Sequence, residues 1–106
     1  MPVVTHHKLV RDRIPEIIEA SGKRCRTEIL PQEEYLIMLD RKLGEELAEY
    51  QESKSMEELA DLVEVIRAVA LARGSSMVEV ERIRREKKAL RGGFEKRILL
   101  REVRDE

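Results

Sequence analysis

A short polar break at residues 51–54 separates two long amphipathic segments, and this feature constrains the fold most strongly. Apolar residues recur at helical spacing on both sides of the break, so each segment is expected to form a helix. Pro31 suits the first turn of the first helix, Ser55 is a typical N-cap for the second, and Gly74 is a typical helix end. Because the connection is so short, the two helices should fold back on each other as an antiparallel αα-hairpin.

Each of these helices carries two carboxylates three residues apart, Glu46 with Glu49 and Glu58 with Asp61. Side chains at this spacing are neighbours on one helix face, where like charges repel. At about 100° per residue, the pairs lie roughly 95° and roughly 110° from their apolar stripes, in the same rotational sense. Antiparallel packing then turns both pairs toward the same side of the hairpin, at similar depth from its loop. The sequence therefore predicts a cluster of four carboxylates.

Two other interpretations of these carboxylates are available. The run Ser55-Met56-Glu57-Glu58 is also a capping box, in which Glu58 would cap its own helix. This role would explain Glu58 but not Asp61, Glu46 or Glu49. In addition, 41% of the residues are charged, so glutamates at helical spacing arise often by chance and each pair alone could be a solvated face.

A third long helix is expected from the capping box at residues 76–79 to about Arg91, where Gly92 and Gly93 stop it. Lys87 falls inside the apolar stripe of this helix, and Arg91 lies on the adjoining flank. The aliphatic part of Lys87 either covers apolar surface or carries its charge toward the carboxylates or a bound phosphate.

The remaining segments predict smaller elements. Pro15 suits the first turn of a short helix that stops near Gly22. Residues 24–30 alternate in polarity and are expected to form a strand with Cys25 as a small core residue, and residues 97–103 could pair with it. The expected fold is therefore mainly α, an antiparallel helical hairpin or bundle in one domain, with a small two-stranded β element.

Composition and charge exclude several classes of function. The 21 basic and 22 acidic residues give a net charge of −1, without the broad basic footprint of a nucleic-acid binder. One cysteine excludes an intramolecular disulfide and a cysteine metal site, and the adjacent His6 and His7 are read as ordinary terminal residues. No membrane span or signal peptide is evident, so a cytoplasmic location without membrane partners is expected. A chain of 106 residues buries a modest core, which oligomerisation is expected to complete.

Converging carboxylates offer hard oxygen ligands, which select hard cations such as Mg²⁺. Such ions stabilise charge on a transferring phosphoryl group and lower the pKa of an attacking water. Glu45, one residue from Glu46, could orient that water or act as general base. Four basic residues are candidates for binding substrate phosphate, and each could equally be a surface charge: Lys87, Arg91, Lys8 and Arg11.

Four stretches of the chain together carry a family resemblance. They are EELAE at 45–49, ELAD at 58–61, KLVRD at 8–12 and RGGF at 91–94. The first two resemble the acidic motif of the all-α nucleoside triphosphate pyrophosphohydrolases of the MazG type. The other two are similar to signatures of a short branch that resembles phosphoribosyl-ATP pyrophosphohydrolase. The resemblance spans nearly the whole chain, 1–106, as a single MazG-like domain.

The resemblance implies a Mg²⁺-dependent hydrolase, with Mn²⁺ as an alternative ion, that cleaves the α–β phosphate bond of a nucleotide to pyrophosphate and a nucleoside monophosphate. It implies metal ligation by Glu46, Glu49, Glu58 and Asp61, with Glu45 assisting. It also implies a homodimer or homotetramer with sites near subunit contacts. The expected role is house-cleaning of noncanonical nucleotides. The alternatives are phosphoribosyl-ATP hydrolysis in histidine synthesis and a noncatalytic helical oligomer or binding module.

Overall fold

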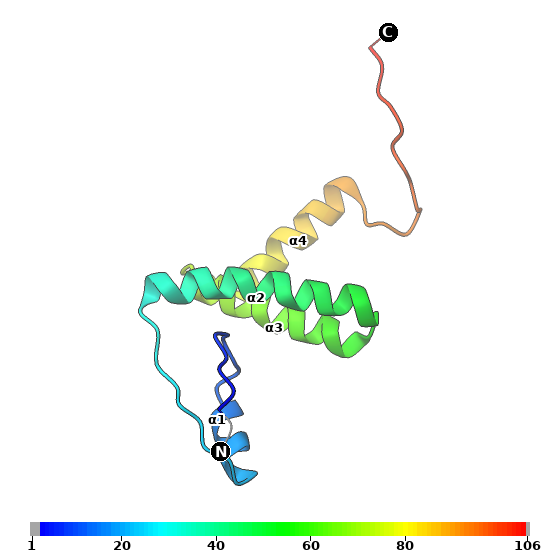
Figure 1. Cartoon of the computed structure of the whole chain (residues 1–106). Helices are drawn as coiled ribbons and strands as arrows, with labels where there is room; N and C mark the ends of the chain where they lie inside the picture. The colour runs from blue at the N-terminus through cyan, green and yellow to red at the C-terminus, as the bar shows by residue number, and fades with distance from the viewer. Residues whose placement is uncertain (1–2, 106) are drawn as a thin grey trace.

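Two long antiparallel helices form the centre of the molecule in the computed structural model, which describes residues 3–105 (Figure 1). α2 spans Gln32–Ser53 and α3 spans Met56–Ala72, and only Lys54 and Ser55 connect them. A two-residue connection forces the chain to reverse at once, so the two helices pack side by side along their lengths. The predicted mainly α fold with a helical hairpin is confirmed.

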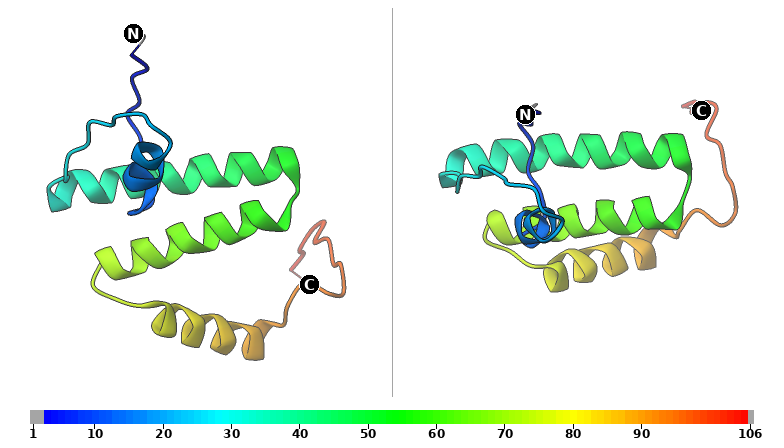
Figure 2. Two further views of the ribbon diagram at one scale, coloured as in Figure 1. Left: turned by 90° about the horizontal axis from the view of Figure 1, so that it is seen from below. Right: turned by 60° about the horizontal axis from the view of Figure 1, so that its bottom comes forward.

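The other two helices lie on different sides of this hairpin (Figures 1 and 2). α1 spans Ile14–Ala20 and makes no helix–helix contact in the described part of the chain. α4 spans Met77–Arg91, follows α3 after a short turn and packs against it. Within residues 3–105, no helix combines the length and the hydropathy that crossing a membrane requires. The most extensive helix packing in the described structure is therefore between α2 and α3.

The turn between α2 and α3 is fixed by backbone and serine hydrogen bonds. Lys54 adopts a left-handed conformation, φ 59°, and its N–H donates to the Tyr50 carbonyl over 2.7 Å. The Ser55 hydroxyl accepts the backbone N–H of Glu58 at 3.3 Å, as predicted for an N-cap. However, the N–H of Ser55 donates to the Ser53 hydroxyl at 3.2 Å and not to the Glu58 carboxylate. Only half of the predicted capping box forms, so Glu58 is not used as a cap.

The end of α3 also follows the sequence prediction. Gly74 has a φ of 83°, a conformation that a residue with a Cβ atom adopts only with strain. Two backbone hydrogen bonds close the turn, from Gly74 N to Leu71 O at 3.1 Å and from Ser75 N to Ala70 O at 2.8 Å. Ser76 then caps α4 by accepting the backbone N–H three residues further on. These bonds set the direction in which α4 leaves the hairpin.

The predicted two-stranded β element is wrong for the described residues. Residues 24–30 and 97–103 are not strands, and they lie on different sides of the hairpin, too far apart to pair (Figures 1 and 2). Arg97 has a φ of 58°, which interrupts the second segment at its start. Cys25 is half-buried in a loop, where its thiol donates to the Pro15 carbonyl at 3.5 Å. The alternating pattern therefore reflects a loop held near α1.

The core of a single chain is very small. Leu39 and Ala70 are the only buried apolar residues in the described range, with 4% and 8% of their surface exposed. The chain exposes 10203 Å², whereas a compact protein of 12.4 kDa exposes about 6,100 Å². The radius of gyration, 19.0 Å, likewise exceeds the roughly 13 Å expected for a compact domain of this length. A large apolar area therefore has no partner within one chain.

Candidate metal centre

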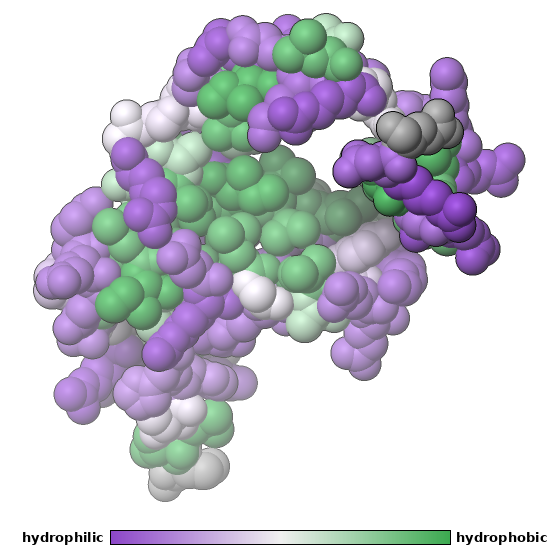
Figure 3. Space-filling view, turned by 90° about the horizontal axis from the view of Figure 1, so that it is seen from above, coloured by the Kyte–Doolittle hydropathy of each residue, from purple (hydrophilic) through white to green (hydrophobic). Residues whose placement is uncertain are grey.

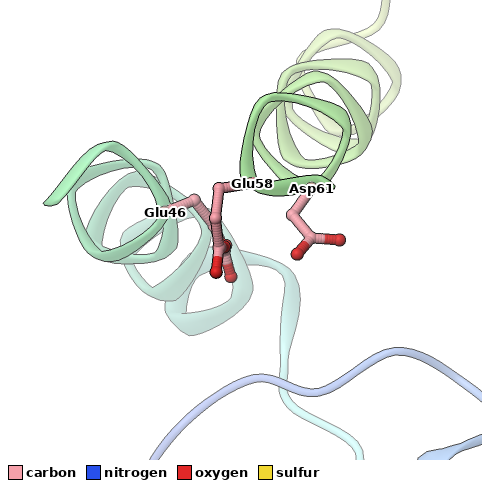
Figure 4. A group of neighbouring side chains, drawn as sticks. All are labelled: Glu46, Glu58 and Asp61. Carbon is pink, nitrogen blue, oxygen red and sulfur yellow. The ribbon is translucent and has the colours of Figure 1, made fainter. Parts of the chain in front are cut away.

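The loop end of the hairpin brings three acidic side chains together (Figure 4). One carboxylate oxygen each from Glu46 on α2 and from Glu58 and Asp61 on α3 lies within 4.8 Å of the other two. Figure 4 shows all three side chains on the same side of the two helices, facing the N-terminal segment. We call these three residues the acidic cluster. It contains three of the four carboxylates that the sequence places on this side.

Glu49, the fourth of these carboxylates, lies at the edge of the acidic cluster. It is exposed, and it follows Glu46 by almost one turn of α2. Its carboxyl group raises the pKa of Glu46, both by sharing a hydrogen bond with it and by its negative charge. Glu49 therefore interacts with the cluster through Glu46.

Glu46 is the most buried member of the acidic cluster, with 7% of its surface exposed. Burial is the largest cause that raises its pKa above the ordinary value of 4.5, and Glu49 adds to this effect. Lys42 opposes it, because the Lys42 Nζ atom lies 3.5 Å from Glu46 Oε1. α2 thus holds the Glu46 carboxylate in a buried environment that disfavours its negative charge, and a bound cation would stabilise that charge.

Two carboxylate oxygens in the cluster have no hydrogen-bond partner. Glu46 Oε2 and Glu58 Oε2 are both buried from solvent, and no donor contacts them in the described structure. A buried polar group left in this state costs about 1–3 kcal/mol. Native proteins keep such groups rarely, and a bound ligand is one explanation for keeping them. The three side chains of the cluster offer only carboxylate oxygens as ligand atoms, so the bound species that fits is a hard cation.

Lys42 belongs to the site, although the sequence analysis did not select it. Its ammonium group lies 3.6 Å from Glu45 Oε2 in addition to its contact with Glu46, and only 21% of its side chain is exposed. Glu45, predicted as the catalytic residue, is itself exposed and held by this ion pair. Its position could have been predicted from the sequence. Lys42 precedes Glu45 by three residues and Glu46 by four, and residues at these spacings are neighbours on a helix.

Arg11 reaches the cluster from the N-terminal segment. Its Nη2 atom lies 2.8 Å from Asp61 Oδ1, with both side chains partly exposed. Among the described residues, this is the only hydrogen bond or ion pair that joins residues 3–30 to the hairpin. Lys8, on the same segment, is exposed and forms no ion pair with the cluster in the described structure.

The structure does not bring Lys87 and Arg91 to the cluster within one chain. Both are exposed on α4, and neither forms an ion pair in the described range. The nearby arginines of α4 are paired with glutamates of the same helix, Arg82 with Glu79 and Arg84 with Glu81. These pairs lower the pKa of both glutamates, so both arginines are already occupied by carboxylates of their own helix.

Comparisons with known proteins identify no family. No protein-family model matches the sequence, and no solved structure matches it. An uncharacterized protein of Mycolicibacterium smegmatis is 55% identical over 42 residues. That match covers 40% of this chain and 43% of the relative, so the two are compared over less than half of either length. The resemblance to MazG-type enzymes therefore stays a prediction from the motifs.

Proposed function

We propose that the acidic cluster binds Mg²⁺ and that the protein hydrolyses nucleoside triphosphates to nucleoside monophosphates and pyrophosphate. The observation that carries the proposal is the pair of buried, unpartnered oxygens Glu46 Oε2 and Glu58 Oε2 beside Asp61. Their oxygen-only surroundings suit Mg²⁺, and Mn²⁺ is the closest substitute. The motif resemblance of residues 45–49 and 58–61 supports the choice of reaction.

The charge of the site leaves it in need of divalent cations. The three cluster residues, Glu49 and Glu45 supply five carboxylates, while Lys42 and Arg11 supply two positive charges. If all are ionised, the formal charge is −3, and it becomes −4 when Arg11 leaves Asp61. One divalent cation would reduce this charge, and two would neutralise it.

Each acidic residue receives a role that its position permits. Glu46, Glu58 and Asp61 would ligate the ion, and Glu49 would complete the set from the edge. The bound ion would supply Lewis-acid stabilisation of the transferring phosphoryl group and a lowered pKa for the attacking water. Glu45 would orient that water, because it adjoins Glu46 in the sequence and shares the Lys42 ammonium group with it.

Arg11 would change partners when the cation and substrate bind. Its present contact, Asp61 Oδ1, is on a proposed metal ligand, so the cation and the guanidinium compete for the same carboxylate. An arginine released from a carboxylate is well suited to a phosphate, which it binds through two parallel hydrogen bonds. Lys8 would add charge from the same segment. Lys87 and Arg91 would contact substrate only if a second copy of the chain supplied them.

The test is an assay of pyrophosphate release from the purified protein with Mg²⁺. The panel contains standard and noncanonical nucleoside triphosphates together with phosphoribosyl-ATP. Wild type should release pyrophosphate from at least one of them, and Asp61→Asn should lower kcat/KM by at least about 100-fold because it removes charge from the ion site. The matched control is Glu64→Gln on the same helix, whose carboxylate pairs with Arg67 and should leave activity unchanged.

The pattern over the panel separates the candidate functions. Activity on noncanonical triphosphates supports the house-cleaning role, and activity confined to phosphoribosyl-ATP supports the biosynthetic one. Release of pyrophosphate from none of them contradicts the proposed reaction and favours a noncatalytic binding module. Equal activities of Asp61→Asn and Glu64→Gln would contradict the proposed site.

A further inference from the structure

An aromatic ring lies one helical turn beyond the acidic cluster, toward the loop end of the hairpin. It belongs to Tyr50, near the end of α2, which follows Glu46 by four positions. Residues at this spacing are neighbours on one helix face, about 6 Å apart along the axis. At about 100° per residue, Glu46 and Tyr50 lie about 20° to either side of the buried Leu39. The ring therefore adjoins the proposed ion site.

One face of this ring is covered by an exposed lysine. The Nζ atom of Lys54 lies 5.6 Å from the centroid of the Tyr50 ring, and Lys54 is the left-handed residue that ends α2. Tyr50 itself is half-buried. Within residues 3–105, the Lys54 ammonium group forms no ion pair with a carboxylate. Because a cation–π contact at an exposed site is weak, a flat ligand can displace the ammonium group and stack on the same face of the ring.

The opposite side of the molecule does not suit a nucleotide. Figure 3 views the face turned away from the N-terminal segment, and hydrophobic side chains gather across its centre. An apolar surface offers no counter-charge to a polyphosphate chain. A nucleotide whose phosphates bind at the acidic cluster therefore extends its base along the cluster side of the hairpin or toward the loop end, where Tyr50 lies. Tyr35, near the start of α2, is at the far end of the helix.

We infer that Tyr50 stacks against the base of the bound nucleotide and that Lys54 donates a hydrogen bond to the edge of that base. The inference rests on the proposed function only in taking a nucleotide as the ligand of the acidic cluster. Every base has a flat π face, so Tyr50 binds bases without discriminating between them. Lys54 discriminates, because an ammonium group only donates hydrogen bonds and therefore binds a carbonyl oxygen but not an amino group.

This chemistry defines the substrate class. Guanine and thymine present a carbonyl oxygen at the position where adenine and cytosine present an amino group. Hypoxanthine and uracil, which form when adenine and cytosine lose that amino group by hydrolysis, present the carbonyl oxygen as well. The preferred substrates are thus nucleotides with a carbonyl oxygen at this position, and deaminated nucleotides are among them.

Calorimetry with Mg²⁺ and the α,β-methylene analogues of inosine and adenosine triphosphate tests the inference, because the bond to be cleaved is blocked in both. Wild type should bind the inosine analogue at least about fivefold more tightly. Tyr50→Leu should weaken the binding of both analogues by at least about fivefold, whereas Tyr50→Phe keeps the ring and should bind like wild type. Tyr35→Leu, at the other end of α2, is the matched control.

Lys54→Gln covers the case in which Tyr50→Leu loses its helices by circular dichroism, because Lys54 is exposed. The glutamine amide both donates and accepts, so this variant should bind the two analogues equally. The inference is overturned if wild type binds neither analogue or shows no preference. It is also overturned if a folded Tyr50→Leu binds like wild type, or if Lys54→Gln keeps the preference.

A separate assay of pyrophosphate release distinguishes this inference from the proposed reaction. If the inosine analogue binds through Tyr50 but no nucleotide yields pyrophosphate, the base site stands and the hydrolase activity is wrong. If wild type and Tyr50→Leu release pyrophosphate with equal kcat/KM, the hydrolase activity stands and the base site is wrong.

Discussion

The guanidinium of Arg11 lies 2.8 Å from the Asp61 carboxylate, although the two residues are 50 positions apart in the sequence. This contact is the only described hydrogen bond or ion pair between residues 3–30 and the hairpin, and it ends on a proposed metal ligand. If the acidic cluster binds Mg²⁺ as proposed, its occupation is coupled to the attachment of the N-terminal segment, because the metal ion and the guanidinium need the same carboxylate.

Arg11→Gln should loosen the N-terminal segment and strengthen Mg²⁺ binding by up to about fivefold, since a partly exposed ion pair is worth at most about 1 kcal/mol. Trypsin cleavage after Lys23 or Arg24 should become faster, and calorimetry should detect the tighter binding. Arg13→Gln is the control, because Arg13 pairs with Glu16 on α1 and not with the hairpin. Identical behaviour of the two variants would refute the coupling.

Mg²⁺ should stabilise the wild-type protein by about 2.7 kcal/mol when its free concentration is 100 times the Kd. Glu58→Gln should lose most of this gain, whereas Glu57→Gln should keep it. The two residues are neighbours in the first turn of α3, so they share the helix dipole and differ in which way the side chain points. Thermal unfolding with Mg²⁺ and with EDTA measures the difference, and equal shifts in both variants would argue against the site.

Glu46→Gln should stabilise the metal-free protein near neutral pH by about 1 kcal/mol and remove its response to Mg²⁺. Because burial raises the pKa of Glu46, the folded chain binds this proton more tightly than the unfolded chain. Its contribution to stability is therefore greatest below the ordinary pKa of 4.5 and falls as the pH rises through the raised value. Urea unfolding in EDTA between about pH 4 and about pH 8 should give a flatter profile for the variant. An unchanged slope would mean that the burial of Glu46 has no energetic consequence.

Ser55→Ala should lower the free energy of unfolding by about 1 kcal/mol, because it removes the hydroxyl that caps α3. Ser75→Ala changes an exposed serine in the connection between α3 and α4 and should lower the free energy of unfolding much less. Since the cap lies in the two-residue connection, its loss should also weaken Mg²⁺ binding by loosening the register of Glu46 against Glu58. Equal unfolding curves for the two alanine variants would show that the cap contributes nothing.

The hairpin and the meeting of Glu46 with Glu58 could be predicted because local features determine them. Apolar spacing set the buried face of each helix, and the short connection fixed their antiparallel order. The sequence left Glu58 with two roles, cap or cluster member. That choice depends on the Ser53 hydroxyl, which takes the Ser55 N–H that the glutamate would otherwise accept. Such a competition between two acceptors is not encoded in residue spacing.

Long-range relationships were harder to predict, for a physical reason. The alternation of residues 24–30 describes one extended segment but does not identify a partner strand, and the segment is a loop. The position of Arg11 depends on the path of the whole chain between residues 12 and 31. The sequence correctly predicts that Lys87 lies on the third long helix. However, the turn at Gly74 sets the direction of α4, and Lys87 forms no ion pair with the cluster in the described structure.

Binding of a divalent ion to the acidic cluster can be followed by titrating Mn²⁺ into the ¹⁵N-labelled protein, because the paramagnetic ion broadens the amide signals nearest to it. The signals of Glu46, Glu58 and Asp61 should broaden first and recover when excess Mg²⁺ displaces the ion. Sharp signals at these three residues, or broadening centred on the glutamates of α4, would contradict it.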